Sequence, residues 1–139
     1  IQSPHGPAHW GRVKNNGFKI AEHTRGVDIE VIELFSLLHD CCRIDDQNDP
    51  FHGKRAALFA AELRGDFFEL SDSAFESLSY ACEFHTNSQL VNDITVKTCW
   101  DADRLDLFRT GIEPNPDYLF TDYAKTPAMI HWAMARSKI

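Results

Sequence analysis

Apolar positions along the chain recur at helical spacing, and turn-forming residues separate the helical stretches. The pattern predicts six helices, over residues 8–23, 29–38, 51–64, 72–85, 93–109 and 128–137. Pro7 suits a first helical turn, Asp28 and Asp93 suit N-caps, and Gly65 and Gly111 suit helix ends. No segment alternates polar and apolar residues with period two, so we predict an all-α fold.

The length of 139 residues suits one domain, which we place over residues 1–139. About five helices should form its core, over residues 5–112, with a C-terminal extension over 113–139 packed on that core. The helix 29–38 is apolar over most of its surface, so it should be the central and most buried one. Trp132 and Met134 should pack on the core, with a homo-oligomer interface as the alternative.

Composition and charge narrow the class of protein. Hydrophobic residues make up 43% and charged residues 25%, which is ordinary for a soluble globular chain. The net charge of −7 argues against binding of duplex nucleic acid, which usually needs a basic face. The apolar runs are too short to cross a membrane, and the first residues lack a signal pattern.

The four cysteines, Cys41, Cys42, Cys82 and Cys99, form no CxxC pair and no disulfide framework. We therefore expect buried, reduced thiols in a cytoplasmic protein. The acidic segment 45–49 should be a solvated turn, and Asp72 should cap a helix. Three further histidines should be surface or hydrogen-bonded residues: His5, His23 and His131.

The candidate chemistry lies at the end of the apolar helix, in the dipeptide His39-Asp40. His9 precedes it by about thirty residues, and His52, His85 and an acidic cluster at 101–106 follow it. An unpaired imidazole or carboxylate at a buried helix end is costly, so several of them near one point suggest a metal ion as the partner. Facing helices of a bundle can supply such ligands.

The acidic cluster offers more than one ligand. On a helix, Asp103 and Asp106 share a face, whereas Asp101 points elsewhere and can pair with Arg104. We therefore prefer Asp103 as the ligand, with Asp101 as the alternative. Asp106 should support a ligand or contact substrate.

These residues resemble the HD superfamily of metal-dependent phosphohydrolases, whose pattern is H…HD…D. Here the pattern is His9, then His39-Asp40, then Asp103 followed by Arg104-Leu105, which is the common form of the last motif. The resemblance covers roughly residues 5–112. It implies that all four pattern residues bind metal inside a bundle of about five helices.

Some branches of this superfamily carry extra histidines between HD and the final Asp, and these hold a second metal. His52 and His85 stand in matching places. The resemblance therefore implies two metals bridged by Asp40, with a single metal as the alternative. The ions should be divalent: Fe or Mn first, with Mg, Ni, Co or Zn as further candidates.

One departure from the family bears on the reaction. Single-metal nucleotidases and guanosine tetraphosphate hydrolases of the superfamily carry a catalytic glutamate soon after HD, where this chain has Cys41-Cys42-Arg43-Ile44. The expected mechanism is then attack by a metal-bound hydroxide, with Asp40 binding metal and steering the water. Arg43 and Lys54 are the candidate phosphate contacts.

The resemblance thus implies a phosphomonoesterase or phosphodiesterase that acts on a nucleotide or another small phosphorylated metabolite. Two alternatives stay open. A minority of HD proteins resemble di-iron oxygenases, which use a similar set of ligands to activate dioxygen. The second alternative is a non-catalytic module that holds a metal or ligand.

Overall fold

The structure is a computed structural model, and it describes residues 3–87 and 90–137. Within these residues the chain forms six α-helices and two short 3-10 helices, and no strand longer than one isolated bridge. The all-α prediction is confirmed. The elements are α1 (Pro7–Glu22), α2 (Ile29–Leu38), α3 (His52–Leu63), α4 (Asp72–Glu83), α5 (Ile94–Arg104), η1 (Leu107–Thr110), η2 (Pro116–Tyr118) and α6 (Pro127–Ser137).

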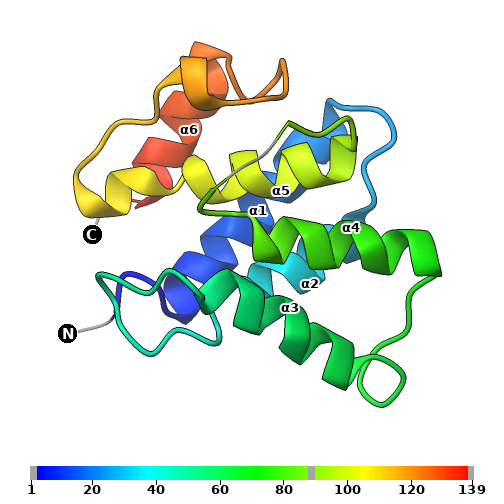
Figure 1. Cartoon of the computed structure of the whole chain (residues 1–139). Helices are drawn as coiled ribbons and strands as arrows, with labels where there is room; N and C mark the ends of the chain where they lie inside the picture. The colour runs from blue at the N-terminus through cyan, green and yellow to red at the C-terminus, as the bar shows by residue number, and fades with distance from the viewer. Residues whose placement is uncertain (1–2, 88–89, 138–139) are drawn as a thin grey trace.

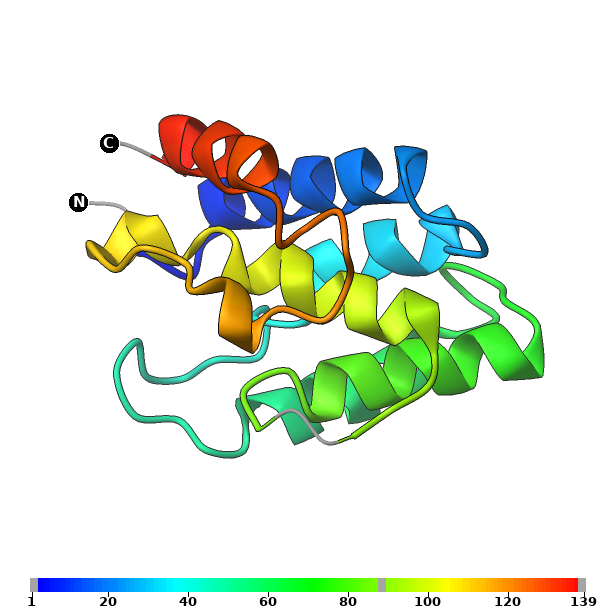
Figure 2. The ribbon, with the colours of Figure 1, turned by 90° about the horizontal axis from the view of Figure 1, so that it is seen from above.

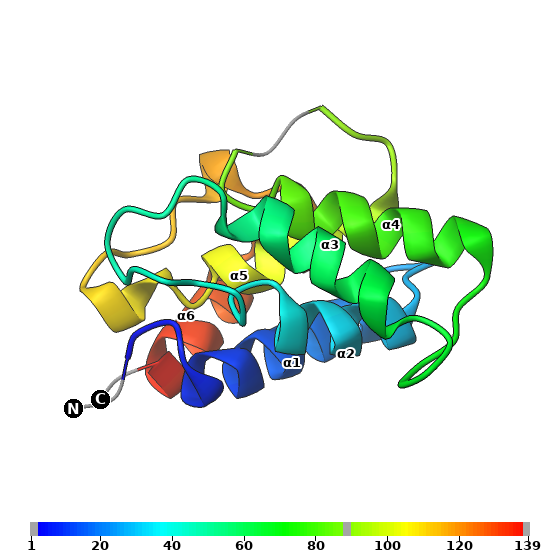
Figure 3. The ribbon, with the colours of Figure 1, turned by 60° about the horizontal axis from the view of Figure 1, so that its bottom comes forward.

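The helices pack as a bundle around α2 and α5 (Figure 1). Helix α1 packs on both of them, and both also contact α4. Helix α3 lies beside α4 on the opposite side of the molecule from α1, as Figure 3 shows. Helix α6 contacts α1 and η1 and lies on the side of the bundle away from α3 (Figure 2). The C-terminal helix therefore packs against α1 and η1.

Side-chain caps explain where three of the helices begin. Asp28 accepts hydrogen bonds from two backbone N–H groups at the start of α2, and Asp93 does the same for α5. Ser71 accepts one from the N–H of Ala74 at the start of α4. Such caps satisfy donors that the first helical turn leaves free. Asp28 and Asp93 confirm the predicted caps, whereas the prediction that Asp72 caps α4 is wrong, because Ser71 is the cap and the Asp72 carboxylate accepts from Arg64.

The end of α5 differs from the prediction. The sequence pattern predicted a helix to Arg109, but the α-helix ends at Arg104 and a 3-10 helix follows over Leu107–Thr110. Asp106 sits between the two as the residue before η1. Periodicity did not reveal the break, because the apolar spacing continues through it.

Two apolar clusters form the core. The larger one joins α1 to α5 and includes the fully buried Phe35 and Leu78. The smaller one holds the C-terminal extension around Leu105 and Met129, and the partly buried Trp132 and Met134 pack against it. Their packing on the core is confirmed.

Helix α2 is central, but the prediction that it is the most buried helix is wrong, because five of its ten residues are buried and seven of the eleven residues of α5 are. Val31, Ile32 and Phe35 are fully buried, whereas Ile29 is 56% and Leu37 is 49% exposed. One face of the helix contacts α1, α4 and α5, and the other reaches the surface. None of the described helices is long and apolar enough to cross a membrane.

Two glycines let helices approach closely. A Cβ atom on Gly17 of α1 would collide with the side chain of Ile32 on α2. A Cβ atom on Gly53 of α3 would lie 2.6 Å from the carbonyl oxygens of Cys82 and Glu83, at the end of α4. Gly53 therefore brings the first residue of α3, His52, against the segment that follows α4.

Asp101 anchors the extension to the core. Its fully buried carboxylate accepts hydrogen bonds from the N–H of Phe120, at 2.8 Å, and from the N–H and hydroxyl of Thr121, each at 2.7 Å. The predicted pairing with Arg104 is wrong. Arg104 instead lies over the ring of Tyr118, 5.6 Å from its centroid.

Candidate metal centre

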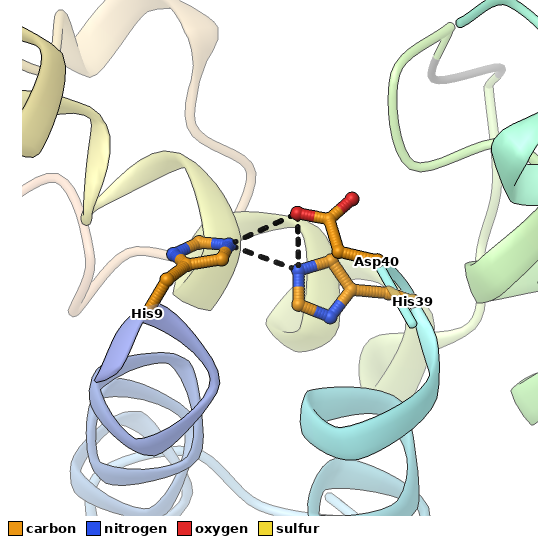
Figure 4. A group of neighbouring side chains, drawn as sticks. All are labelled: His9, His39 and Asp40. Carbon is orange, nitrogen blue, oxygen red and sulfur yellow. Dashed lines mark hydrogen bonds and ion pairs between the residues drawn. The ribbon is translucent and has the colours of Figure 1, made fainter. Parts of the chain in front are cut away.

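Three predicted ligands meet where α1 faces the end of α2 (Figure 4). The Nε2 atoms of His9 and His39 lie 3.1 Å apart, and Asp40 Oδ2 lies 3.4 Å from the first and 3.5 Å from the second. All three side chains are buried. These atoms are close enough to one another to hold a single metal ion.

Asp103 adds a fourth donor from α5. Its Oδ1 atom lies 3.1 Å from His9 Nε2 and 3.4 Å from His39 Nε2. Ligand atoms that bind one zinc-like ion at about 2.1 Å lie roughly 3.0–3.4 Å from one another. The observed separations of 3.1–3.5 Å are close to that spacing. We call His9, His39, Asp103 and Asp40 Oδ2 the first group.

A second group forms on the other side of the same carboxylate. The Nε2 atoms of His52 and His85 lie 2.8 Å apart, and Asp40 Oδ1 lies 3.2 Å and 3.3 Å from them. These residues are also buried, and the set could hold a metal ion. We call His52, His85 and Asp40 Oδ1 the second group. The two oxygens of Asp40 therefore face two different histidine pairs.

The other ring nitrogen of each histidine is held by an acceptor. His39 Nδ1 donates to the carbonyl oxygen of Phe35, and His85 Nδ1 to that of Cys82. His52 Nδ1 donates to the carbonyl oxygen of Asp49. A carbonyl oxygen only accepts, so Nδ1 carries the proton in each ring and the neutral ring has a lone pair at Nε2.

The facing nitrogen atoms of the two histidine pairs indicate that these residues fit a metal ion. In each pair, the two Nε2 atoms face each other across about 3 Å, with carboxylate oxygens around them. Two neutral rings in this position repel each other unless a proton or a metal ion lies between the Nε2 atoms. The donor set, the anchored tautomers and the spacing all suit divalent ions.

The charges around the first group favour a cation. Burial acts to lower the pKa of His9, but the carboxylates of Asp103, Asp106 and Asp40 outweigh it and raise this pKa to about 10. Burial likewise acts to raise the pKa of Asp40 and Asp103, but the surrounding histidines hold both well below their usual range. The carboxylates are therefore ionised and attract positive charge into the site.

Asp106 orients His9. Its Oδ2 atom accepts from His9 Nδ1 at 2.7 Å, and its Oδ1 atom accepts from Arg12 Nε at 2.7 Å. The side chain is fully buried, and both of its oxygens are engaged. Of the two predicted roles, support of a ligand agrees with this position, and contact with substrate does not.

The segment 45–49 is not simply a solvated turn, and that prediction is wrong at Asp49. Asp49 is 8% exposed and accepts from the N–H of Ile44 and from Arg55. The Arg55 hydrogen bond is the main reason that the pKa of Asp49 falls to about 2. The Asp49 side chain thus closes the loop. This fixes the backbone carbonyl of Asp49, whose oxygen accepts from His52 Nδ1.

His5 is a contact that the sequence analysis missed. Its Nδ1 atom lies 3.2 Å from Asp40 Oδ2, and its Nε2 atom lies 2.8 Å from the carbonyl oxygen of Asp46. It lies four residues before His9, just ahead of α1, and no other feature of the sequence indicated it. His23 stacks on Tyr123 and His131 is exposed, as expected of residues outside a site.

The two predicted phosphate contacts, Arg43 and Lys54, differ in their position relative to the site. Arg43 donates to Asp40 Oδ1 at 3.1 Å and to the carbonyl oxygen of Asp45 at 3.0 Å, so it belongs to the site but is already paired. Lys54 is exposed on α3, and among the described residues it makes no ion pair or hydrogen bond. The structure gives no support to Lys54 as a site residue.

The cysteines are free thiols. Cys82 and Cys99 are buried, as predicted, and burial raises the pKa of each. Cys41 and Cys42 are only partly buried, which corrects the expectation of four buried cysteines. Their sulfur atoms lie 3.6 Å apart, directly after Asp40.

A cavity of about 200 Å³ adjoins the two groups. His85 of the second group and Asp103 of the first line its wall, and Arg104, Arg109, Trp100 and Phe120 line the rest with Thr86 and Leu107. The candidate metal centre is therefore next to a cavity that a small ligand can enter.

Comparison with known proteins adds nothing to this geometry: no family model, no curated protein and no solved structure matches the chain. The candidate metal centre therefore depends on the sequence pattern and the contacts described above.

Proposed function

We propose that the protein is a metal-dependent phosphohydrolase that acts on a small phosphorylated metabolite and uses two divalent ions. The observation that carries the proposal is the position of Asp40, whose two oxygens face two separate pairs of histidine nitrogens. A carboxylate in that position is suited to bridge two ions. The resemblance to the HD superfamily supports the same reading.

Six residues would hold the ions: His9, His39, Asp40, Asp103, His52 and His85. Bound divalent ions supply Lewis acidity, which lowers the pKa of water toward ~7 and neutralises phosphoryl charge. Neutral imidazole and carboxylate suit Fe and Mn first, with Mg, Ni, Co and Zn as further candidates.

The chain's own residues set up the site. The carbonyl and carboxylate acceptors on each Nδ1 keep every Nε2 lone pair directed inward. Asp40 holds the two groups together and is the residue placed to orient a water molecule between them. Arg43 donates to Asp40 and partly offsets the negative charge that the carboxylates collect.

Among the described residues, no glutamate faces the two histidine pairs. The four residues that follow Asp40 supply thiols, a guanidinium and an aliphatic chain, and Ile44 is 85% exposed. A reaction that requires a glutamate as general base has no candidate there. This favours a mechanism in which Asp40 steers the attacking water and bound divalent ions would supply the Lewis acidity.

The test is metal analysis of anaerobically purified protein, followed by a screen for phosphate release from sugar phosphates, other small phosphomonoesters, phosphodiesters and nucleotides. We expect about two ions per chain and phosphate release under Mn²⁺ or Fe²⁺. The His131→Ala variant, which alters an exposed histidine on α6, should match the wild type in both measurements.

The same experiment separates the alternatives. Oxygen consumption by the iron-loaded protein without phosphate release would replace the hydrolase with an oxygenase. A full complement of ions with no turnover across the panel would indicate a binding module. Protein that takes up no ion from Mn²⁺, Fe²⁺ or Zn²⁺ solutions would overturn the proposal.

A further inference from the structure

The cavity beside the metal centre has a charged side. Asp103 and His85 form the part of its wall that belongs to the candidate ligands, and two arginines, Arg104 and Arg109, line the same space. Neither arginine was among the phosphate contacts that the sequence predicted. The cations in the wall of this cavity therefore come from the end of α5 and from η1.

Arg104 has no acidic partner. Among the described residues its side chain makes no ion pair and no hydrogen bond, and its guanidinium lies over the ring of Tyr118, 5.6 Å from the centroid. It is only partly exposed, and the next residue toward the N-terminus is the ligand Asp103. A half-buried guanidinium without a carboxylate retains its full capacity to bind an anion in two-pronged fashion.

Arg109 is held in place by the backbone. Its Nε donates to the carbonyl oxygen of Pro4 at 2.6 Å and its Nη1 to that of Asp106 at 2.9 Å. Asp106, the nearest carboxylate, lies 3.9 Å away and is already engaged by His9 and Arg12. Arg109 therefore adds a fixed positive charge to the cavity.

The remaining wall is apolar and the space is small. Trp100 and Phe120 face each other at a ring separation of 5.6 Å and both line the cavity. Its volume of about 200 Å³ lies below the roughly 300–1,000 Å³ of pockets that take drug-sized ligands. A group of a few heavy atoms fits there more readily than a nucleoside does.

We infer that this cavity is the substrate site, that its occupant is a phosphomonoester with a small organic part, and that Arg104 binds the phosphoryl group from the side opposite the metal centre. The organic part would lie against Trp100 and Phe120. The inference rests on the proposed function and deepens it, since it selects a small metabolite over a nucleotide and Arg104 over Arg43 and Lys54.

The test uses inorganic phosphate as the probe and the Mn²⁺-loaded full chain as the receptor, with binding measured by isothermal titration calorimetry. Charge-assisted hydrogen bonds contribute about 1.5–3 kcal/mol. Arg104→Gln should therefore weaken phosphate binding about 10- to 100-fold. Arg104→Lys, which keeps the charge but not the two-pronged geometry, should recover part of the loss.

Arg25→Gln is the matched control. It removes the same charge from an exposed residue beyond the far end of α1, and phosphate binding should stay at the wild-type level. Each variant is also analysed for manganese, and its content should be unchanged. If Arg104→Gln binds phosphate as tightly as the wild type while fully loaded with metal, the role of Arg104 is refuted and the proposed function stands. If the wild type binds no metal, both fail.

The size of the substrate is tested separately. We expect kcat/KM for phosphomonoesters of two or three carbons to exceed that for nucleoside monophosphates by about tenfold or more, because the base and ribose do not fit beside Trp100 and Phe120. Equal or better turnover of nucleotides would contradict the small-metabolite assignment without affecting the metal centre.

Discussion

The two groups that share Asp40 are held in different ways. In the first group, His9 is oriented by the carboxylate of Asp106, and Asp103 contributes a second charged donor. In the second group, both histidines are oriented by backbone carbonyls, and Asp40 Oδ1 is the one carboxylate oxygen. The first group therefore has more negative charge and more donors for a cation.

The groups also differ in the elements that build them. The first group joins α1, α2 and α5, which pack on one another along their lengths. The second depends on the first residue of α3 and on a residue just after α4. Both groups lie at or near helix ends, so what separates them is the larger number of donors and carboxylates in the first group. We expect the first group to bind its ion more tightly and the second to lose its ion first.

Removing the shared residue should have the largest effect. Asp40→Ala takes a donor from both groups, so we expect loss of both ions and of all phosphatase activity, while the circular dichroism spectrum stays helical. His39→Ala should also abolish activity and strip the first ion. Elemental analysis of the purified variants checks this. Unchanged metal content in Asp40→Ala would refute a bridging role for this residue.

Removing a ligand of the second group alone should show whether the two groups bind their ions independently. His52→Ala leaves the first group intact, so the metal content should fall from about two ions per chain to about one. His85→Ala should give the same result. The control is His131→Ala, which should keep both ions. If His52→Ala still carries two ions, the second group is not a metal site.

A smaller effect is expected when Asp106, the carboxylate that orients His9, is replaced. Asp106→Asn keeps the shape of the side chain but removes the charge that orients the imidazole. Loss of such a support typically lowers metal affinity about 10- to 100-fold. We expect that loss at the first group alone, measured by competition with a chelator. Asp122→Asn, at an exposed acid, serves as the control.

The smallest effect is expected from the contact that positions His52. Gly53→Ala places a methyl group against the carbonyls of Cys82 and Glu83, and the overpacking should cost about 1–3 kcal/mol of unfolding free energy. The second group should also bind its ion more weakly. Urea denaturation and metal titration measure the two effects.

Gly11→Ala is the matched control, because a Cβ atom there has no neighbour within 4 Å and the site is exposed on α1. It should leave stability equal or slightly higher. A Gly53→Ala variant as stable as Gly11→Ala, with normal metal affinity, would show that the close approach of α3 to α4 does not set the second group.

The sequence predicted the parts of the molecule that local rules determine. Caps such as Asp28 and Asp93 mark helix starts by side chain to backbone contacts within three residues, so the helix order could be predicted. The HD pattern placed His9, His39 and Asp103 in helices that do meet. Their convergence followed from order and spacing.

The parts that the sequence did not predict depend on contacts between distant segments. Asp106 reaches His9 across 97 positions, and the burial of Asp101 follows from its bonds to Phe120 and Thr121. The cavity that holds Arg104 exists only once α5, η1 and the segment around Phe120 are folded together. No periodicity in the chain records such contacts, and the phosphate contacts were therefore assigned to Arg43 and Lys54.

The central claim is that two cations lie on either side of Asp40. The most direct measurement is a crystal structure of the Mn²⁺- or Fe²⁺-loaded protein with anomalous diffraction at the edge of the metal. We predict two anomalous peaks, one within bonding distance of His9, His39 and Asp103 and the other within bonding distance of His52 and His85, with one Asp40 oxygen directed to each. A single peak on one side of Asp40, or none at full metal loading, would contradict the account.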